Sequence, residues 1–94
     1  MIHELKTRPD VFEATWKGFK QYEVRIADRP FKLNDVVILK EYDEKKRKYS
    51  GREMQTTITF ITSVDNVYDS LRLHTNLVVF QVKPYKWVDP KNEN

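Results

Sequence analysis

Three runs of residues in this chain carry strand patterns, and they strongly limit the folds it can adopt. Residues 53–62 alternate between the two faces of an extended segment and are rich in threonine. Residues 36–42 and 77–82 are nearly continuous apolar runs of strand length. A period of two and an abundance of β-branched residues favour strands over helices. The chain is therefore expected to be mainly β.

One segment near the N-terminus has helical spacing instead. A helix is expected from Pro9 to Lys17, with Thr7 as its cap and proline suited to its first turn. Phe12 and Trp16 stand one turn apart in an apolar stripe, which we interpret as core. Gly18 is expected to end the helix in the left-handed conformation.

Two weaker strand patterns, at residues 2–6 and 21–26, bring the expected number of strands to about five. Short strands joined by hairpin-length connections must curl to bury both ends of their core. We therefore predict an α+β fold, a small β-barrel with one N-terminal helix packed against it.

The length of 94 residues indicates a single domain over residues 1–94. Residues 65–76 are ambiguous, with a short helical turn around Tyr68 and Leu71 as one alternative. From Pro84 onwards the chain is expected to form a polar tail that is frayed over residues 86–94.

Composition excludes several kinds of site. The chain has no cysteine, so neither a disulfide framework nor a thiolate zinc site is possible. His3 and His74 are the only histidines and are far apart in sequence, so no metal and no cofactor are expected. No apolar run approaches the ~20 residues that span a membrane, and the N-terminus lacks a signal-peptide pattern. We expect a cytoplasmic protein without a membrane partner.

Charge is concentrated in the stretch from Lys17 to Asn34. It holds five positive and two negative side chains, a net of +3, which equals the net charge of the whole chain. A local basic excess favours an anionic partner. The alternative is an ordinary solvated strand with surface ion pairs.

The strand inside this stretch has two dissimilar faces. Tyr22, Val24 and Ile26 share one face and are expected to join the core. Glu23 and Arg25 share the other, which is expected to be exposed.

Polar residues near the predicted strand ends form the candidate site. The residues expected to bind the ligand are His3, Lys6, Lys20, Glu23, Arg25, Arg29, Glu41, Tyr42 and Arg52. Lys20 and Glu23 are also the candidate catalytic pair, because a lysine and a glutamate in one pocket can transfer a proton. Equally, Glu23 can serve only as the counter-ion that fixes Arg25 or Lys20.

Residues 18–25, Gly-Phe-Lys-Gln-Tyr-Glu-Val-Arg, resemble the Gly-x-Lys-x-x-Glu-x-Arg motif of ASCH domains (activating signal cointegrator homology), which belong to the PUA-like superfamily of β-barrels. The similarity extends through Asp28-Arg29, the Asn34-Asp35 turn, residues 39–43 and residues 49–53. With residues 3–6 in front, the chain resembles a small bacterial and phage-associated branch of unknown function. The resemblance implies a barrel with a cleft beside the first helix, lined by the motif.

The resemblance also bears on activity. Relatives are thought to bind RNA or nucleotides, and a few small ones are amidohydrolases that act on acetylated cytidine. Those hydrolases are similar to this chain at Lys20 and Arg25, but they carry a threonine nucleophile where this chain has Glu23. Glutamate cannot supply that hydroxyl, so the comparison favours binding over catalysis.

Three functions are therefore compared. An RNA- or nucleotide-binding module ranks first, because of the local charge and of aromatic residues that can stack on a base (Tyr22, Tyr42, Tyr49). A small hydrolase that activates water with Lys20 and Glu23 ranks second. A protein-interaction module ranks third, because the sequence offers no specific motif for it. The ligand and the oligomeric state stay open.

Overall fold

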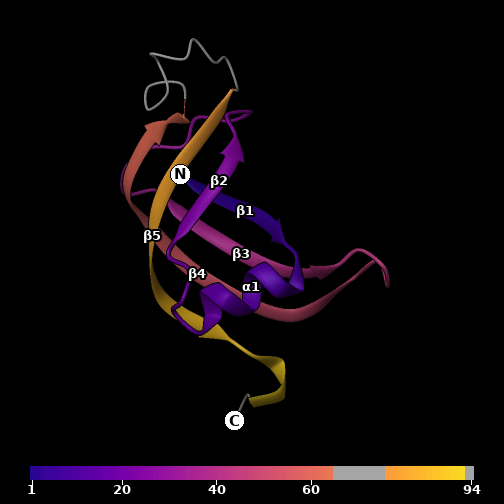
Figure 1. Ribbon diagram of the computed structural model, residues 1–94. Helices are drawn as coiled ribbons and strands as arrows, with labels where there is room; N and C mark the ends of the chain where they lie inside the picture. Colours follow the sequence, from indigo (N-terminus) through magenta and orange to yellow (C-terminus); the bar gives the residue numbers. More distant parts are fainter. Residues whose placement is uncertain (65–75, 93–94) are drawn as a thin grey trace.

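The computed structural model describes residues 1–64 and 76–92, and within them the chain is mostly β with one short α-helix (Figure 1). The elements are β1 (Ile2–Thr7), α1 (Pro9–Trp16), β2 (Tyr22–Ile26), β3 (Val36–Asp43), β4 (Lys48–Ser63), β5 (Leu77–Val88) and the 3₁₀-helix η2 (Pro90–Asn92). The predicted fold class is confirmed. Tyr68, Leu71 and His74 lie outside the described residues.

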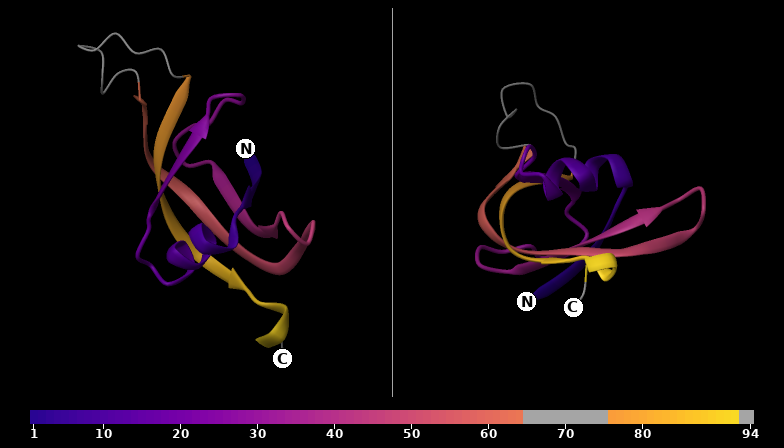
Figure 2. Two further views of the ribbon diagram at one scale, coloured as in Figure 1. Left: turned by 45° about the vertical axis from the view of Figure 1, so that its right-hand side comes forward. Right: turned by 90° about the horizontal axis from the view of Figure 1, so that it is seen from below.

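The strands form one sheet in the order β1-β3-β4-β5-β2. β1 pairs with β3 in parallel, and the other pairs are antiparallel. A parallel pair needs a crossover connection, and here it contains α1 and β2. The long strands β4 and β5 bend so that the sheet curls into a half-barrel, with β1 and β2 as its two edges (Figure 2).

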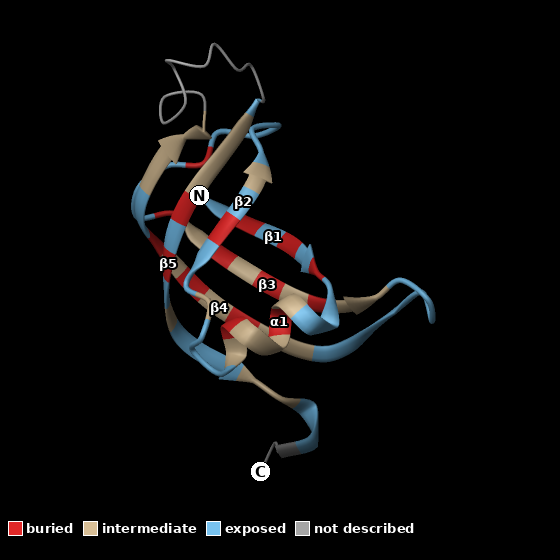
Figure 3. Cartoon of the chain, viewed as in Figure 1, coloured by how far each residue is buried: buried red, intermediate tan, exposed pale blue. Residues whose placement is uncertain are grey.

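The core fills the inside of this curl. Alternate residues of the strands point inward, which gives the striped burial visible in Figure 3. The buried apolar side chains are Leu5, Phe12, Phe31, Val37, Leu39, Met54, Ile58, Phe80 and Val82. Phe12 brings α1 onto the core, and the half-buried Trp16 packs beside it with ring centroids 5.6 Å apart. The core positions predicted for Phe12 and Trp16 are thus confirmed, whereas Phe19, which helical spacing also placed in this apolar stripe, is exposed.

The helix begins differently from the prediction. Thr7 is the last residue of β1, and the N-cap is Arg8, whose side chain makes no capping hydrogen bond. The side chain of Thr7 is buried and contacts Arg25 of β2 instead. The helix end follows the prediction, because Gly18 has a φ of 84°.

β2 faces the opposite way from the prediction. Tyr22, Val24 and Ile26 are 52%, 48% and 60% exposed, whereas Glu23 is only 2% exposed. The register with β5 explains the reversal: Glu23 lies opposite Phe80, and directly opposed residues of two antiparallel strands point to the same face. Since Phe80 fills the core, Glu23 points inward with it.

The predicted polar tail is also wrong over its first part. β5 continues past Pro84 to Val88, where it pairs with Glu53 of β4. Proline lacks an amide hydrogen and is accommodated in sheets at irregular positions, and Pro84 stands at a shift in the β4–β5 register. The following η2 then approaches Gly51 of β4.

Candidate functional site

The candidate site is built around the buried carboxylate of Glu23. Its Oε1 accepts hydrogen bonds from Nη2 and Nε of Arg25, at 2.8 and 3.2 Å. Its Oε2 accepts one from Nζ of Lys20, which also donates to the carbonyl oxygen of Tyr22. The left-handed turn at Gly18 ends the helix two residues before Lys20, so Lys20 can reach back over the start of β2. Glu23 therefore holds two cationic side chains in fixed positions.

Arg25 also connects the two edges of the half-barrel. Its Nη1 donates to the carbonyl oxygen of Lys6 at 3.2 Å, and its Nη2 donates to Oγ1 of Thr7 at 3.3 Å. Both acceptors belong to β1, whereas Arg25 and Glu23 belong to β2. The guanidinium group thus spans the opening between the edge strands while its other side is held by the carboxylate.

Two hollows adjoin this guanidinium group. The larger, about 650 Å³, runs between the edges of β1 and β2 and is called the β1–β2 groove below. The smaller, about 250 Å³, lies beside the start of α1 and is lined by Thr7, Lys20 and Glu23 among others. Lys6, Val24 and Arg25 line both hollows, so Arg25 stands where the two meet.

The β1–β2 groove has a basic and partly aromatic lining. Its charged residues are Lys6, Arg25, Arg29 and Lys40 against Glu4 and Asp28, and its aromatic residues are Phe31 and Tyr49. Arg29 Nε lies 3.6 Å from the carboxylate of Asp28, and its guanidinium carbon lies 5.9 Å from the centre of the Phe31 ring. Among the described residues, Arg25, Arg29 and Lys40 have acidic partners and Lys6 has none, so the lining offers an anionic ligand several cationic donors and one unpaired charge.

Lys40 was not among the predicted site residues. Its hydrogen bond to Glu4 at 3.4 Å raises the pKa of the lysine, so it stays protonated. Lys40 reaches the groove because the parallel register places it opposite Lys6. Phe31, in the loop before β3, and Thr7, at the end of β1, were missed as well. Only strand register and loop path bring these three residues to the site, and neither can be read from the local sequence.

Glu41 and Arg52 form a second cluster, separate from Glu23. Arg52 donates to Glu41 at 3.0 and 2.9 Å and to Glu13 of α1 at 2.7 Å, while the hydroxyl of Ser50 donates to Glu41 at 2.6 Å. Hydrogen bonds from Arg52 hold the pKa of Glu41 and of Glu13 below their ordinary values, although burial opposes the shift. This cluster fixes the helix to the sheet and lines neither hollow.

The Arg52 guanidinium group also packs on the helix, with its carbon 5.1 and 4.9 Å from the ring centres of Phe12 and Trp16. Such cation–π contacts add to the attachment of α1. Glu41 and Arg52, predicted as ligand-binding residues, are therefore placed in a structural network.

His3 lines neither of the two hollows, although its ring packs on Phe31 of the groove lining with centroids 4.6 Å apart. Its Nε2 and Asp35 Oδ2 are 2.7 Å apart, and the other oxygen of Asp35 lies 3.2 Å from the N-terminal amine. The hydrogen bond to His3 is the largest cause that lowers the pKa of Asp35. This contact anchors the start of β1 to the turn before β3. Among residues 1–64 and 76–92, no cluster of histidine and acidic side chains is placed to hold a metal ion.

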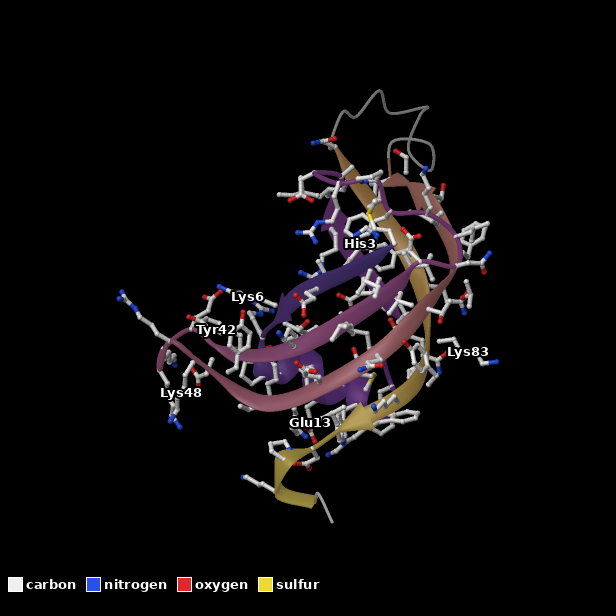
Figure 4. The ribbon with its side chains drawn as sticks, turned by 180° about the vertical axis from the view of Figure 1, so that it is seen from behind. His3, Lys6, Glu13, Tyr42, Lys48 and Lys83 are labelled. Atoms are coloured by element: carbon white, nitrogen blue, oxygen red, sulfur yellow. The ribbon has the colours of Figure 1, made fainter. Side chains whose placement is uncertain are left out.

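Tyr42 lies at the rim of the groove rather than inside it. Nζ of Lys6 is 4.4 Å from the centre of its ring, and the two side chains lie side by side in Figure 4. The ring of Tyr42 also meets Tyr49 edge to face, with centroids 4.8 Å apart. Of the predicted site residues, Lys6, Arg25 and Arg29 line the groove itself. Lys20 and Glu23 do not line it, and Glu23 is connected to it by its hydrogen bonds with Arg25.

The model of one protein family, described as a domain of unknown function (DUF3850), matches residues 2–82. The chain belongs to this family. No curated protein matches the DUF3850 chain. In the part of the chain that the structure describes, no helix is long and apolar enough to cross a membrane.

The extent of the family match bears on the site. It begins at the first residue of β1 and ends within β5, so it includes every residue that lines the two hollows. The second half of β5, residues 83–88, and η2 lie beyond it. The hollows are therefore part of the DUF3850 unit itself and not of an appended segment.

Proposed function

We propose that this DUF3850 protein is an RNA- or nucleotide-binding module of the ASCH type and that its ligand lies in the β1–β2 groove. The inward direction of Glu23 and Arg25 carries the proposal. Burying an aliphatic side chain contributes about 1.5–3 kcal/mol, yet β2 exposes its apolar face and buries a charged one. A strand that contradicts its own hydrophobic pattern in this way is expected at a functional site.

The preorganisation of Arg25 supports an anionic ligand. A guanidinium group is planar and offers paired donors that match a phosphate group, and Glu23 already fixes its orientation. Arg29 adds a second, partly exposed cation in the same groove. A phosphate between these two side chains would accept hydrogen bonds from guanidinium groups that Glu23 and Asp28 already hold in place.

The rest of the lining supports a base attached to that phosphate. Single-stranded nucleic acid is recognised through unstacked bases on aromatic side chains, and Tyr49 is 45% exposed at the groove. The groove volume of about 650 Å³ falls within the usual range of roughly 300–1,000 Å³ for small-ligand sites.

Fluorescence anisotropy with labelled single-stranded RNA and with a labelled nucleotide tests the proposal. Arg29→Gln removes a groove cation without disturbing Glu23 and should weaken binding about tenfold, the effect of losing one charged hydrogen bond. Lys17→Gln is the control, because it removes an equal charge from the end of α1, outside both hollows. Equal affinities of the two variants, or no binding at low salt by the unaltered protein, would refute the proposal.

A small amidohydrolase is the second candidate, favoured by the contact between Lys20 and Glu23 beside the smaller hollow. Both carboxylate oxygens of Glu23 already accept hydrogen bonds from cations, so a substrate or water would have to compete with Lys20 and Arg25 for them. We expect hydrolysis of acetylcytidine to be weak or absent when cytidine release is followed. Robust turnover that disappears in both Lys20→Ala and Glu23→Ala would make the protein an enzyme.

A further inference from the structure

The cationic side chains of the described residues divide into two groups. Seven have an acidic partner: Arg8, Lys17, Lys20, Arg25, Arg29, Lys40 and Arg52. Those without an ion pair among the described residues are Lys6, Lys32, Lys45, Lys46, Arg47, Lys48, Lys83, Lys86 and Lys91. Four of the unpaired cations, residues 45–48, are consecutive. The free positive charge of the described chain is thus most concentrated at one turn.

This turn joins β3 to β4. Oδ1 of Asp43 accepts hydrogen bonds from the backbone amides of Lys45 and Lys46, at 2.9 and 3.2 Å, and Arg47 has a φ of 53°. The carboxylate therefore shapes the backbone, while the four cationic side chains are exposed and point to solvent. With Asp43 and Glu44 counted, residues 43–48 carry four positive and two negative charges, a net of +2. Figures 1 and 2 show the hairpin reaching out beyond the curled sheet.

The base of the hairpin is continuous with the β1–β2 groove. Tyr42 and Tyr49 lie opposite one another just before the turn, with Lys6 over the first ring and Lys40 over the second, at 4.4 and 5.4 Å. Lys6, Lys40 and Tyr49 also line the groove. In Figure 4, Lys6 and Tyr42 lie together at the base and Lys48 points away from the body. A track of cations and aromatic rings leads from the groove to the turn.

We infer that the β3–β4 hairpin is a phosphate-binding arm, and that the ligand of the groove is a single-stranded RNA that continues along this arm. The inference rests on the proposed function and names its ligand as a polynucleotide. From Lys40 to the end of β3 at Asp43 the extended strand spans about 10 Å, at ~3.3 Å per residue. A stacked nucleic-acid strand rises ~3.4 Å per nucleotide, so about three nucleotides cover the distance from Lys40 to the start of the turn.

The chemistry of the track favours RNA over other anionic partners. Lysines act as mobile point charges that follow a line of phosphates, and the tyrosine pair offers faces on which bases can stack. A lipid surface would use the lysines and leave the rings at the hairpin base without a role. A single-stranded polynucleotide uses both.

The test compares two variants with equal loss of charge. Lys45, Lys46 and Lys48 are changed to glutamine in the arm variant, and Arg47 is kept because of its left-handed turn conformation. Lys83, Lys86 and Lys91 are changed to glutamine in the control, where Lys83 lies on the opposite side of the molecule from the hairpin (Figure 4). Each variant takes the formal net charge from +3 to 0.

Anisotropy is measured with a mononucleotide, a trinucleotide and a twelve-nucleotide RNA across a range of salt concentrations. The arm variant should bind the two short ligands as the unaltered protein does and the long RNA about tenfold more weakly or worse. Its salt dependence should be shallower by ~0.7 in the logarithmic slope for each phosphate that the arm no longer neutralises. The control should keep the affinity for all three ligands.

Other results separate the arm from the groove. Unchanged binding of the long RNA by the arm variant refutes the arm and leaves the groove proposal standing. Equal losses in both triple variants refute it too, because net charge alone would then explain them. Loss of long-RNA binding in the arm variant, with no nucleotide binding by any form, upholds the arm and refutes the groove. Binding of phosphatidylserine vesicles in place of RNA makes a lipid surface the partner and refutes both.

Discussion

Glu23→Gln is the substitution that most directly tests whether the buried carboxylate holds the site together. Glutamine has the same shape, but it replaces the oxygen that faces Lys20 by an amide that donates, so two donors meet in a site where the side chain is 2% exposed. A hydrogen bond to a charged group contributes about 1.5–3 kcal/mol, and a buried unsatisfied group costs about 1–3 kcal/mol. These effects overlap and are not additive.

The exposure of the two partner side chains narrows the expected loss of unfolding free energy. The side chains of Lys20 and Arg25 are 18% and 26% exposed, so both can turn partly toward water once the carboxylate is removed. We therefore expect the free energy of unfolding to fall by about 2–3 kcal/mol rather than by the 3–5 kcal/mol of a fully enclosed pair. For a domain of this size, that loss lowers the melting temperature by about 10–20 °C.

Urea denaturation followed by tryptophan fluorescence measures the effect, with Asp28→Asn as the control. Asp28 makes a comparable ion pair with Arg29, but its side chain is 64% exposed, and such pairs contribute at most about 1 kcal/mol. A Glu23→Gln protein as stable as the control would show that the carboxylate is not required for the inward packing of β2. The denaturant slope should stay the same, because the surface exposed on unfolding does not change.

Four further substitutions test the packing and the electrostatics. Trp16→Ala should lower the unfolding free energy by about 2 kcal/mol, which is less than for a fully enclosed ring because Trp16 is half-buried. A loss below about 0.5 kcal/mol would show that Trp16 does not contribute to the packing of α1. Gly51→Ala should lower the unfolding free energy, measured by urea denaturation, by about 2 kcal/mol or more, since the new Cβ would lie 2.7 Å from Pro90. Gly18→Ala, with open space around it, should lower it by about 1 kcal/mol. Equal losses in the two variants would contradict the Pro90 contact. Hydrogen bonds lower the pKa of Asp35 in the folded state, so below about pH 4 the unfolded chain binds more protons than the folded one. The contribution of Asp35 to the unfolding free energy should therefore be fully present above that pH and decrease as the pH drops toward about 2. In Asp35→Asn this acid-induced loss should be smaller, and an identical pH profile would contradict the assignment.

The sequence was sufficient for the type of each main element. Apolar runs and two-residue alternation identified β3, β4 and the first part of β5, and helical spacing identified α1. These patterns depend only on neighbouring residues, and the packing of the folded chain favours the same elements. The last part of β5 was missed because Pro84 is a reasonable stop signal, and only its pairing at a register shift with β4 lets the strand continue.

The direction of β2 could not be predicted, because alternation identifies two faces without saying which one meets the core. The default assigns the apolar face inward, and here the register with β5 and the bonds from Arg25 to β1 reverse it. The sequence could name Lys20, Glu23 and Arg25 as a group, since they follow one another closely. It could not show that Glu41 and Arg52 meet Glu13 instead, because that contact joins residues 39 positions apart.

The two edges of the sheet have a consequence for recognition by the backbone. Among the strands that the structure describes, β1 and β2 are the edges of the sheet and have no strand partner on the side that faces the groove, so main-chain amides and carbonyls stand along both rims. One of these carbonyls, that of Lys6, already accepts a hydrogen bond from Arg25. Peptide groups are identical at every position, so contacts made through them persist when side chains are exchanged. Under the proposed function, contacts made through these peptide groups would add to the affinity for the ligand and would not change when groove side chains are truncated.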